Sequence, residues 1–213
     1  MLANSFESEI DVRNFLQSCL KSNFKVSKIE KKPFKKSPSP PFTTSTLQQE
    51  ASRKLGYSVS RTMSAAQKLY ESGFITYMRT DSVNLSNDAV DSIQGVIKSN
   101  FGENYSLTRK YNNKNKGAQE AHEAIRPTKI ENSEVLSETD SIKLYKLIWK
   151  RTISSQMSDA KLERTIITIE SDQFKNQFRA KGEVVKFDGF LRVYIAGTDN
   201  LEDDDSLEIL PNY

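Results

Sequence analysis

The sequence is poor in the residues that make covalent cross-links and metal sites. Its 213 residues include one cysteine, Cys19, and one histidine, His122. A single cysteine excludes an internal disulfide, and one cysteine with one histidine argues strongly against a structural zinc site. No stretch approaches the roughly 18 apolar residues of a membrane span, and the N-terminus lacks the basic start and apolar run of a signal peptide. The sequence therefore predicts a cytoplasmic protein without a membrane segment.

Charge is distributed unevenly, although the net charge is only +3. Residues 21–36 contain seven lysines and one glutamate, whereas residues 187–213 contain seven acidic residues and one arginine. The basic run indicates either attraction to a polyanion or a solvated strand and linker. The acidic run, centred on residues 202–205, is more typical of a hydrated turn than of a metal site.

The pattern of apolar residues predicts a helical block between two β-prone pieces. A helix over about 10–20 precedes a strand that contains Phe24 and Val26, and three prolines within residues 38–41 then indicate an extended linker. Further helices are expected at about 46–55, 61–72, 87–99 and 138–157. The candidate caps of the first three are Thr43, Thr44 or Ser45, then Ser58 or Ser60, and then Ser86. In the helix over 61–72, the expected apolar stripe consists of Met63, Ala66, Leu69 and Tyr70.

From about residue 162, apolar residues alternate with polar ones, which is typical of strands. Alternation over 165–169, 174–180 and 191–195 predicts an antiparallel β region. The expected fold class is α+β: a helical domain with helix-turn-helix or winged-helix-like elements, inserted into a discontinuous antiparallel β domain. The expected limits are 1–37 for the first β part, 38–161 for the helical domain and 162–213 for the second β part.

The stretch Phe74-Ile-Thr-Tyr-Met-Arg-Thr-Asp-Ser82 is a candidate for chemistry. In a strand, Tyr77 and Arg79 would face one side, with Thr76, Met78 and Thr80 on the other. A guanidinium favours the phenolate and can hold phosphate oxygens, so the pair suits phosphate chemistry. The alternative is structural, with a buried tyrosine beside an exposed arginine.

A second polar stretch, Glu120-Ala-His-Glu-Ala-Ile-Arg-Pro-Thr128, contains the only histidine. His122-Glu123 resembles the start of a zinc-protease helix, but arginine occupies position 126, where the second histidine would stand. The stretch is either a polar helix end or a site where the imidazole meets a phosphate.

Four stretches together resemble bacterial DNA topoisomerase I, a type IA enzyme. They are residues 41–49, 69–82 and 120–128, and the turn Phe187-Asp-Gly189. Met78 matches the topoisomerase I subgroup, since topoisomerase III enzymes tend to have proline at that position. The resemblance implies that the β domain is an arch, and that the helical domain carries the catalytic tyrosine.

By this resemblance, Tyr77 attacks a phosphodiester in single-stranded DNA and forms a 5′-phosphotyrosyl link, negative supercoils relax, and no ATP is needed. Arg79 and His122 would act on the scissile phosphate. The resemblance implies supporting or DNA-contacting roles for Glu71, Thr80, Asp81 and Arg126.

Members of this family bind Mg²⁺ through an acidic cluster in a Toprim domain, and this sequence contains no such motif. The resemblance therefore implies a central fragment, without metal ligands of its own. Its partners would be the Toprim and gate-base domains of the same polypeptide and a single-stranded region of DNA at the nucleoid. We expect the isolated chain to be inactive.

Two other functions fit the pattern less closely. A winged-helix module would bind duplex DNA through a recognition helix, with Arg61, Thr62 and Ser64 as its contact residues. A protein-interaction domain would bind no DNA.

Overall fold

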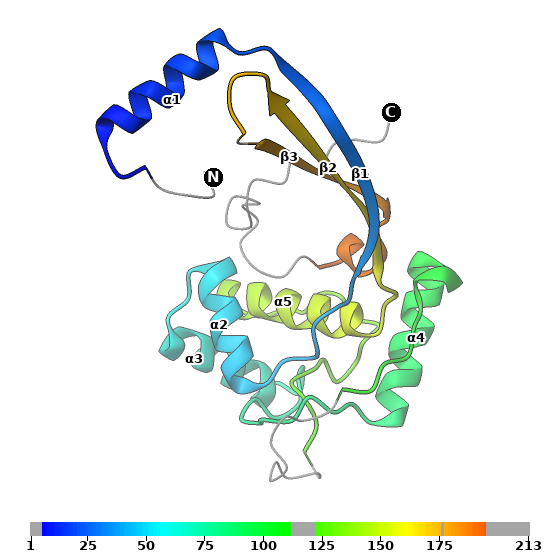
Figure 1. Ribbon diagram of the computed structural model, residues 1–213. Coiled ribbons are helices and arrows are strands. Elements are labelled where there is room, and N and C mark those ends of the chain that lie inside the picture. Colours follow the sequence, from blue (N-terminus) through cyan, green and yellow to red (C-terminus); the bar gives the residue numbers. More distant parts are fainter. Residues whose placement is uncertain (1–5, 112–121, 176, 195–213) are drawn as a thin grey trace. The chain divides into compact units, whose positions relative to one another are not determined.

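The computed structural model describes residues 6–111, 122–175 and 177–194, and these pack as two units (Figure 1). One unit, the sheet unit, contains the described residues up to Phe34 together with Leu162–Val185. The other, the helical unit, contains the described parts of Lys35–Lys161 and the residues from Lys186 to Tyr194. Within the described residues the chain therefore passes between the units three times, each time within a β-strand. The domain limits expected from the sequence stay a prediction.

The sheet unit consists of helix α1 (Glu9–Lys21) and strands β1 (Phe24–Lys36), β2 (Ala160–Ser171) and β3 (Gln177–Phe187). The strand order is β1-β2-β3. At one end of the sheet, the Asn23 backbone donates a hydrogen bond to the Asp172 carboxylate, 2.9 Å long, and farther along the Ser27 hydroxyl donates to the Thr168 carbonyl. Residue numbers rise along β1 while those of the partners in β2 fall, so the two strands are antiparallel, as expected.

Phenylalanine rings connect α1 to the sheet. Phe15 of α1 lies 5.3 Å from Phe174, and Phe24 of β1 lies 5.5 Å from Phe178 of β3, measured between ring centroids. Only three side chains in the described part of the unit are buried, those of Leu162, Thr168 and Glu183. Edge-to-face and tilted ring contacts therefore contribute much of the packing in this unit.

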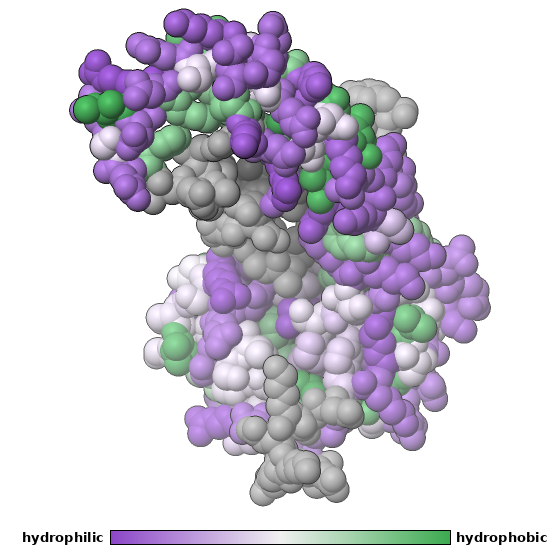
Figure 2. All heavy atoms as spheres, viewed as in Figure 1, coloured by the Kyte–Doolittle hydropathy of each residue, from purple (hydrophilic) through white to green (hydrophobic). Residues whose placement is uncertain are grey.

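Six of the seven lysines of the basic run lie on exposed positions of β1, and the seventh, Lys21, ends α1. Part of their charge is neutralised locally. Glu30 lies 3.0 Å from Lys28 and 3.8 Å from Lys32. The hydrogen bond from Lys28, with the nearby positive charges, lowers the pKa of the Glu30 carboxyl. Figure 2 shows mainly hydrophilic residues on the visible face of this unit, with hydrophobic ones among them. Both interpretations of the basic run remain open.

The helical unit contains the four helices α2 (Thr44–Leu55), α3 (Val59–Glu71), α4 (Asn87–Phe101) and α5 (Thr139–Ser155), and the 3₁₀ turns η1 (Glu103–Tyr105) and η2 (Gly189–Arg192). The expected capping residues are confirmed. The side chains of Thr43, Ser58 and Ser86 accept hydrogen bonds from the first turns of α2, α3 and α4. Gly56 ends α2 with a φ of 64°, which glycine adopts without strain.

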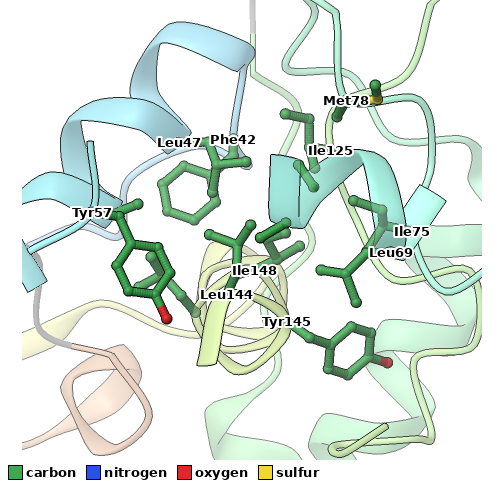
Figure 3. Close-up of a cluster of buried hydrophobic side chains, with 14 of the residues drawn as sticks. Phe42, Leu47, Tyr57, Leu69, Ile75, Met78, Ile125, Leu144, Tyr145 and Ile148 are labelled. Atoms are coloured by element: carbon green, nitrogen blue, oxygen red, sulfur yellow. The ribbon is translucent and has the colours of Figure 1, made fainter. Parts of the chain in front are cut away.

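The core of the helical unit lies where α5 packs against α2 and α3 (Figure 3). Leu144 and Ile148 of α5 are fully buried, as are Leu47 of α2 and Leu69 of α3. Non-helical segments complete the core with Phe42, Ile75, Met78 and Ile125. The residues on both sides of Tyr77 therefore belong to the same core as the long helices.

A buried polar network ties the proline linker to this core. The Arg151 guanidinium donates to the Pro40 carbonyl, 2.7 Å away, and lies over the ring of Phe42. It also donates to the Tyr194 hydroxyl, which in turn donates to the Glu50 carboxylate. All three charged or phenolic side chains are buried. Each hydrogen-bonds another member of the network, as buried polar groups require.

The strand expected over 174–180 is confirmed from Gln177 onward as the start of β3, although residues 174 and 175 precede that strand. The strand expected over 191–195 is wrong in its described residues, because residues 191–193 belong to η2 and its end. Gly189 has a φ of 52°, and a Cβ there would lie 2.5 Å from the Ser158 carbonyl oxygen. The Phe190 backbone donates to that same carbonyl, and Phe190 is buried. This tight approach bends the chain into a 3₁₀ turn before the alternation could form a strand. Residue 195 and the acidic run at 202–205 lie outside the described residues.

None of the helices described has the length and apolar character to cross a membrane.

Candidate active site

The segment that contains Tyr77 is not a strand, contrary to the expectation from its sequence. It makes one bridge, between Ile75 and Pro127, and then continues as bends. Backbone hydrogen bonds from Thr76 N–H to the Arg126 carbonyl and from Thr128 N–H to the Phe74 carbonyl flank this bridge. The Arg126 N–H then donates to the Thr76 hydroxyl in place of the Thr76 carbonyl, so the ladder does not continue. Alternation nevertheless holds over four residues, with Tyr77 and Arg79 exposed and Met78 and Thr80 buried. Both Tyr77 and Arg79 are thus exposed although the segment is not a strand, and their facing one side stays a prediction.

Thr44, at the start of α2, holds the backbone of this segment. Its hydroxyl donates to the Met78 carbonyl at 2.8 Å and accepts the Thr80 N–H at 2.8 Å. The Thr44 N–H donates to the Thr80 carbonyl at 2.9 Å. One side chain therefore fixes the backbone on both sides of Arg79, while the Arg79 side chain stays outside.

The histidine-containing segment lies beside the tyrosine segment. The Thr76 N–H donates to the Arg126 carbonyl at 2.9 Å, and the Arg126 N–H donates to the Thr76 hydroxyl at 3.0 Å. That hydroxyl donates in turn to the Ala124 carbonyl at 2.7 Å. On its other side, Ile125 pairs with Phe42. The two sequence motifs, about 45 residues apart, therefore form one structural element with the linker that precedes α2.

Glu123 and Arg126, both in the histidine-containing segment, form a half-buried ion pair. The Arg126 guanidinium lies 2.7 Å from the Glu123 carboxylate, which also accepts the Ser86 N–H at 2.7 Å. Burial raises the pKa of the Glu123 carboxyl, but hydrogen bonds from Ser86 and Arg126 outweigh it and the net shift is downward. The pair thus joins the histidine segment to the start of α4. Next to it, α4 and residues 126–131 line a cavity of about 210 Å³.

The other expected site residues differ in how they are held. Arg79, Asp81 and His122 are exposed. Within the described residues, none of the three makes a hydrogen bond or ion pair. Glu71, at the end of α3, is exposed and accepts a 2.6 Å hydrogen bond from Gln67. Thr80 is buried, and its hydroxyl accepts the Ser82 N–H. Arg126 is 17% exposed, so its guanidinium is committed to the Glu123 pair.

Reasoning from the sequence missed two residues of this element. Thr44 appeared only as a candidate helix cap, and its bonds to residues 78 and 80 depend on the folded chain. Tyr70 was assigned to the apolar stripe of α3, but it is 40% exposed, and its ring lies 5.2 Å from that of Tyr77. Its position at the edge of the stripe, one residue after buried Leu69, was the available signal.

The residues proposed for duplex recognition are engaged within the chain. Arg61 makes two 2.7 Å hydrogen bonds to the Asp140 carboxylate and lies over the Tyr57 ring. Thr62 is fully buried. A recognition helix needs free side chains on its outer face, so α3 lacks two of the three contacts that the winged-helix hypothesis requires.

Among the described residues, no group of three or more His, Cys, Asp or Glu side chains is arranged to hold a metal ion. The acids nearest to Tyr77 in sequence, Glu71 and Asp81, do not form such a group. The described residues therefore do not fit Mg²⁺.

Comparison with known proteins identifies the family of the chain. Residues 2–213 match the family described as DNA topoisomerase. The chain therefore belongs to the type IA DNA topoisomerase family.

Two DNA topoisomerase 1 proteins match nearly the whole length of this chain. The prokaryotic-type DNA topoisomerase 1 of Acanthamoeba polyphaga mimivirus is 46% identical over 216 residues, which cover 97% of this chain and 25% of that protein. DNA topoisomerase 1 of Rickettsia bellii is 45% identical over 221 residues, covering 97% of this chain and 28% of that protein. The structure resembles that of full-length topoisomerase I from Thermotoga maritima, with a TM-score of 0.76 and 35% identity. That match covers 93% of this chain and 34% of the other. The chain thus spans about a quarter of the length of these two curated relatives.

Proposed function

We propose that this chain forms the tyrosine-bearing and arch parts of an ATP-independent type IA DNA topoisomerase. The observation that carries the proposal is the alternation along residues 77–80. Met78 and Thr80 are buried and anchor the backbone, while the side chains of Tyr77 and Arg79 are exposed. Family membership supports a DNA substrate, and the adjacent histidine segment supports a site built from both motifs.

In the proposed reaction, the Tyr77 phenol oxygen attacks the phosphorus of a phosphodiester in single-stranded DNA. A bond forms between this oxygen and phosphorus, and the bond from phosphorus to the 3′ oxygen breaks. The phenol loses its proton and the 3′ oxygen gains one, which gives a 5′-phosphotyrosyl link and a 3′-hydroxyl. After another strand has passed, the hydroxyl attacks the phosphotyrosine and restores both groups. The covalent link conserves the bond energy, so negative supercoils relax without ATP.

Arg79 acts in this scheme by holding the phosphate. A guanidinium offers a fork of donors that fits two phosphate oxygens and stabilises charge in the transition state. Arg79 has no partner among the described residues, so its donors are available. His122, also exposed and without a partner there, supports the same phosphate as a hydrogen-bond donor.

The remaining residues act around this centre. Glu71 and Asp81 are exposed carboxylates that border it, while Thr80 and Arg126 maintain the two segments through their contacts. Mg²⁺ belongs to the proposed activity of a whole enzyme, where it would come from the Toprim domain. We expect the 213-residue chain assayed by itself to relax no supercoils, because its sequence lacks the acidic motif of that domain. Such an enzyme would act on DNA at the nucleoid.

A covalent-trapping assay tests the proposal. This chain replaces the matched segment of the Rickettsia bellii topoisomerase, and the chimera is mixed with a 3′-labelled single-stranded oligonucleotide and Mg²⁺. The label is at the 3′ end because the 5′-phosphotyrosyl link retains that part of the strand. Detergent then stops the reaction, and labelled protein is measured.

We expect an adduct with the chimera, none with its Tyr77→Phe variant, and a weaker one with Arg79→Lys, which keeps the charge but loses the fork. An adduct of unchanged strength in Tyr77→Phe would refute the assignment of the nucleophile. A folded chimera without an adduct, alongside an active parent enzyme, would refute the proposed function.

A further inference from the structure

The ring of Tyr77 has one aromatic neighbour among the described residues. The centroids of the Tyr70 and Tyr77 rings are 5.2 Å apart, and the ring planes meet at 66°, which is an edge-to-face contact. Both side chains are half-exposed, at 40% for Tyr70 and 44% for Tyr77. Neither hydroxyl has a hydrogen-bond partner in the described part of the chain. The contact with the Tyr70 ring therefore restrains the orientation of the Tyr77 side chain.

Tyr70 stands on a rigid support. It lies in the last turn of α3, directly after Leu69, which is fully buried in the core. The end of the helix is closed by two backbone hydrogen bonds, from Gly73 N–H to the Tyr70 carbonyl at 2.8 Å and from Phe74 N–H to the Leu69 carbonyl at 2.9 Å. The backbone of Tyr70 is therefore fixed by the packed helix, and helical geometry restricts its ring to two χ1 orientations.

Tyr77, by contrast, has a fixed backbone and a freer side chain. The neighbouring residues on both sides are held, Thr76 by the histidine segment and Met78 by Thr44. The phenol itself extends from irregular backbone toward solvent, where rotation about its side-chain bonds would carry the oxygen far from one position. A nucleophile reacts fastest when it is held near its attack geometry.

We propose that Tyr70 is a positioning residue for Tyr77, and that its ring holds the phenol in the orientation needed to attack the phosphate. This inference rests on the proposed function, because it takes Tyr77 as the nucleophile. Tyr70 contacts the nucleophile through its ring, so phenylalanine serves as well as tyrosine at position 70, whereas an aliphatic side chain does not. An edge-to-face contact of this kind corresponds to a change of about two- to tenfold in rate.

A base-stacking role for Tyr70 makes a different prediction. Stacking on a DNA base would strengthen substrate binding, so its loss would raise the oligonucleotide concentration needed for half-maximal adduct formation. Positioning of Tyr77 instead affects the rate of adduct formation at saturating oligonucleotide. The two effects separate in a titration of the rate against oligonucleotide concentration.

The test combines two readouts on Tyr70→Leu and Tyr70→Phe. In this chain, NMR measures the ring-proton shifts of Tyr77 and the cross-relaxation between the two rings. In the chimera with the Rickettsia enzyme, adduct formation is timed at increasing oligonucleotide concentrations. Tyr70→Phe is the matched control because it removes only a hydroxyl that has no partner in the described part of the chain. Circular dichroism verifies that both variants fold.

We expect Tyr70→Leu to shift the Tyr77 ring resonances and to lower the saturated rate about two- to tenfold, with the half-saturating concentration unchanged. Tyr70→Phe should keep both the cross-relaxation and the rate. The proposal is overturned if Tyr70→Leu reacts at the wild-type rate, if only half-saturation changes, or if the wild-type rings show no cross-relaxation. If wild type itself forms no Tyr77-dependent adduct, the proposed function fails first and the positioning role fails with it.

Discussion

The bond between α2 and the Tyr77 segment makes the sharpest prediction from this structure. Thr44→Val replaces the hydroxyl by a methyl group of nearly the same shape. The buried Thr80 N–H then loses its only acceptor in the described part of the chain, and the Met78 carbonyl loses its donor. Leaving a buried donor unpaired costs about 1–3 kcal/mol. Carbonyls tolerate such a loss better than N–H groups, so we expect a total near 2 kcal/mol in the free energy of unfolding.

The local consequence can be measured at one amide. A loss of about 2 kcal/mol corresponds to a roughly 30-fold increase in the opening equilibrium, so the Thr80 amide should exchange its hydrogen about 30-fold faster. Native-state hydrogen exchange by NMR on this chain provides the readout. The adduct rate of the chimera should fall as well, because the backbone of residues 78–80 orients both Tyr77 and Arg79.

Thr152→Val is the matched control. Thr152 is also buried, at 1% exposure, but its hydroxyl donates only to the Ile148 carbonyl within α5. Its loss should cost about 1 kcal/mol or less and leave the Thr80 amide unchanged. The reasoning is refuted if Thr44→Val leaves the exchange of the Thr80 amide at the wild-type rate, or if Thr152→Val accelerates it equally.

Three further predictions concern the rest of the helical unit. Glu123→Gln should lower stability near neutral pH, and it should reduce the loss of stability on acidification. The reason is that the lowered pKa of the Glu123 carboxyl stabilises the fold above about pH 4.5, and this contribution disappears as the pH falls through the folded-state pKa. Urea unfolding midpoints at neutral and acidic pH measure the effect. Equal acid sensitivity of the wild type and the variant would contradict the prediction. Burial raises the pKa of Tyr145 to about 12. The neutral phenol therefore stabilises the fold below about pH 10 by about 2–3 kcal/mol, and this stabilisation is lost as the pH rises toward 12. In the same urea assay, the stability of Tyr145→Phe should decline less steeply in alkali than that of the wild type. Gly189→Ala should destabilise by more than about 2 kcal/mol, because a Cβ there meets the Ser158 carbonyl at 2.5 Å and the φ is 52°. Gly95→Ala lies in mid-helix with open space around the added Cβ, so it should stabilise the fold by about 0.5–1 kcal/mol. Thermal unfolding compares the two variants. A shift of both unfolding midpoints in the same direction would argue against the close approach at Gly189.

Local features were well predicted wherever they depend on neighbours in sequence. The helices over 44–55, 59–71, 87–101 and 139–155 follow from their caps and spacing, and the observed bounds differ from the expected ones by about two residues. The β-prone segment over 74–79 forms only a single bridge, because side-chain hydroxyls of Thr76 and Thr44 take the backbone hydrogen bonds that a longer ladder would need. The strand predicted over 191–195 failed in its described residues, because a contact between Gly189 and Ser158 bends the chain.

The family, the helices of the tyrosine-bearing part and the exposure of Tyr77 and Arg79 could all be inferred from the sequence. These depend on residue identity and on the direction of side chains along a few consecutive residues, so no distant contact is needed to infer them. Only the folded chain reveals that Thr44 anchors the tyrosine segment, that Glu123 accepts the Ser86 N–H at the start of α4, and that the Tyr70 ring lies against that of Tyr77. Each of these is a contact between parts of the chain whose distance in space is set by core packing. Such distances have no signature in local spacing, because burial around Leu69, Ile75 and Ile125 brings the segments together only when the whole unit folds.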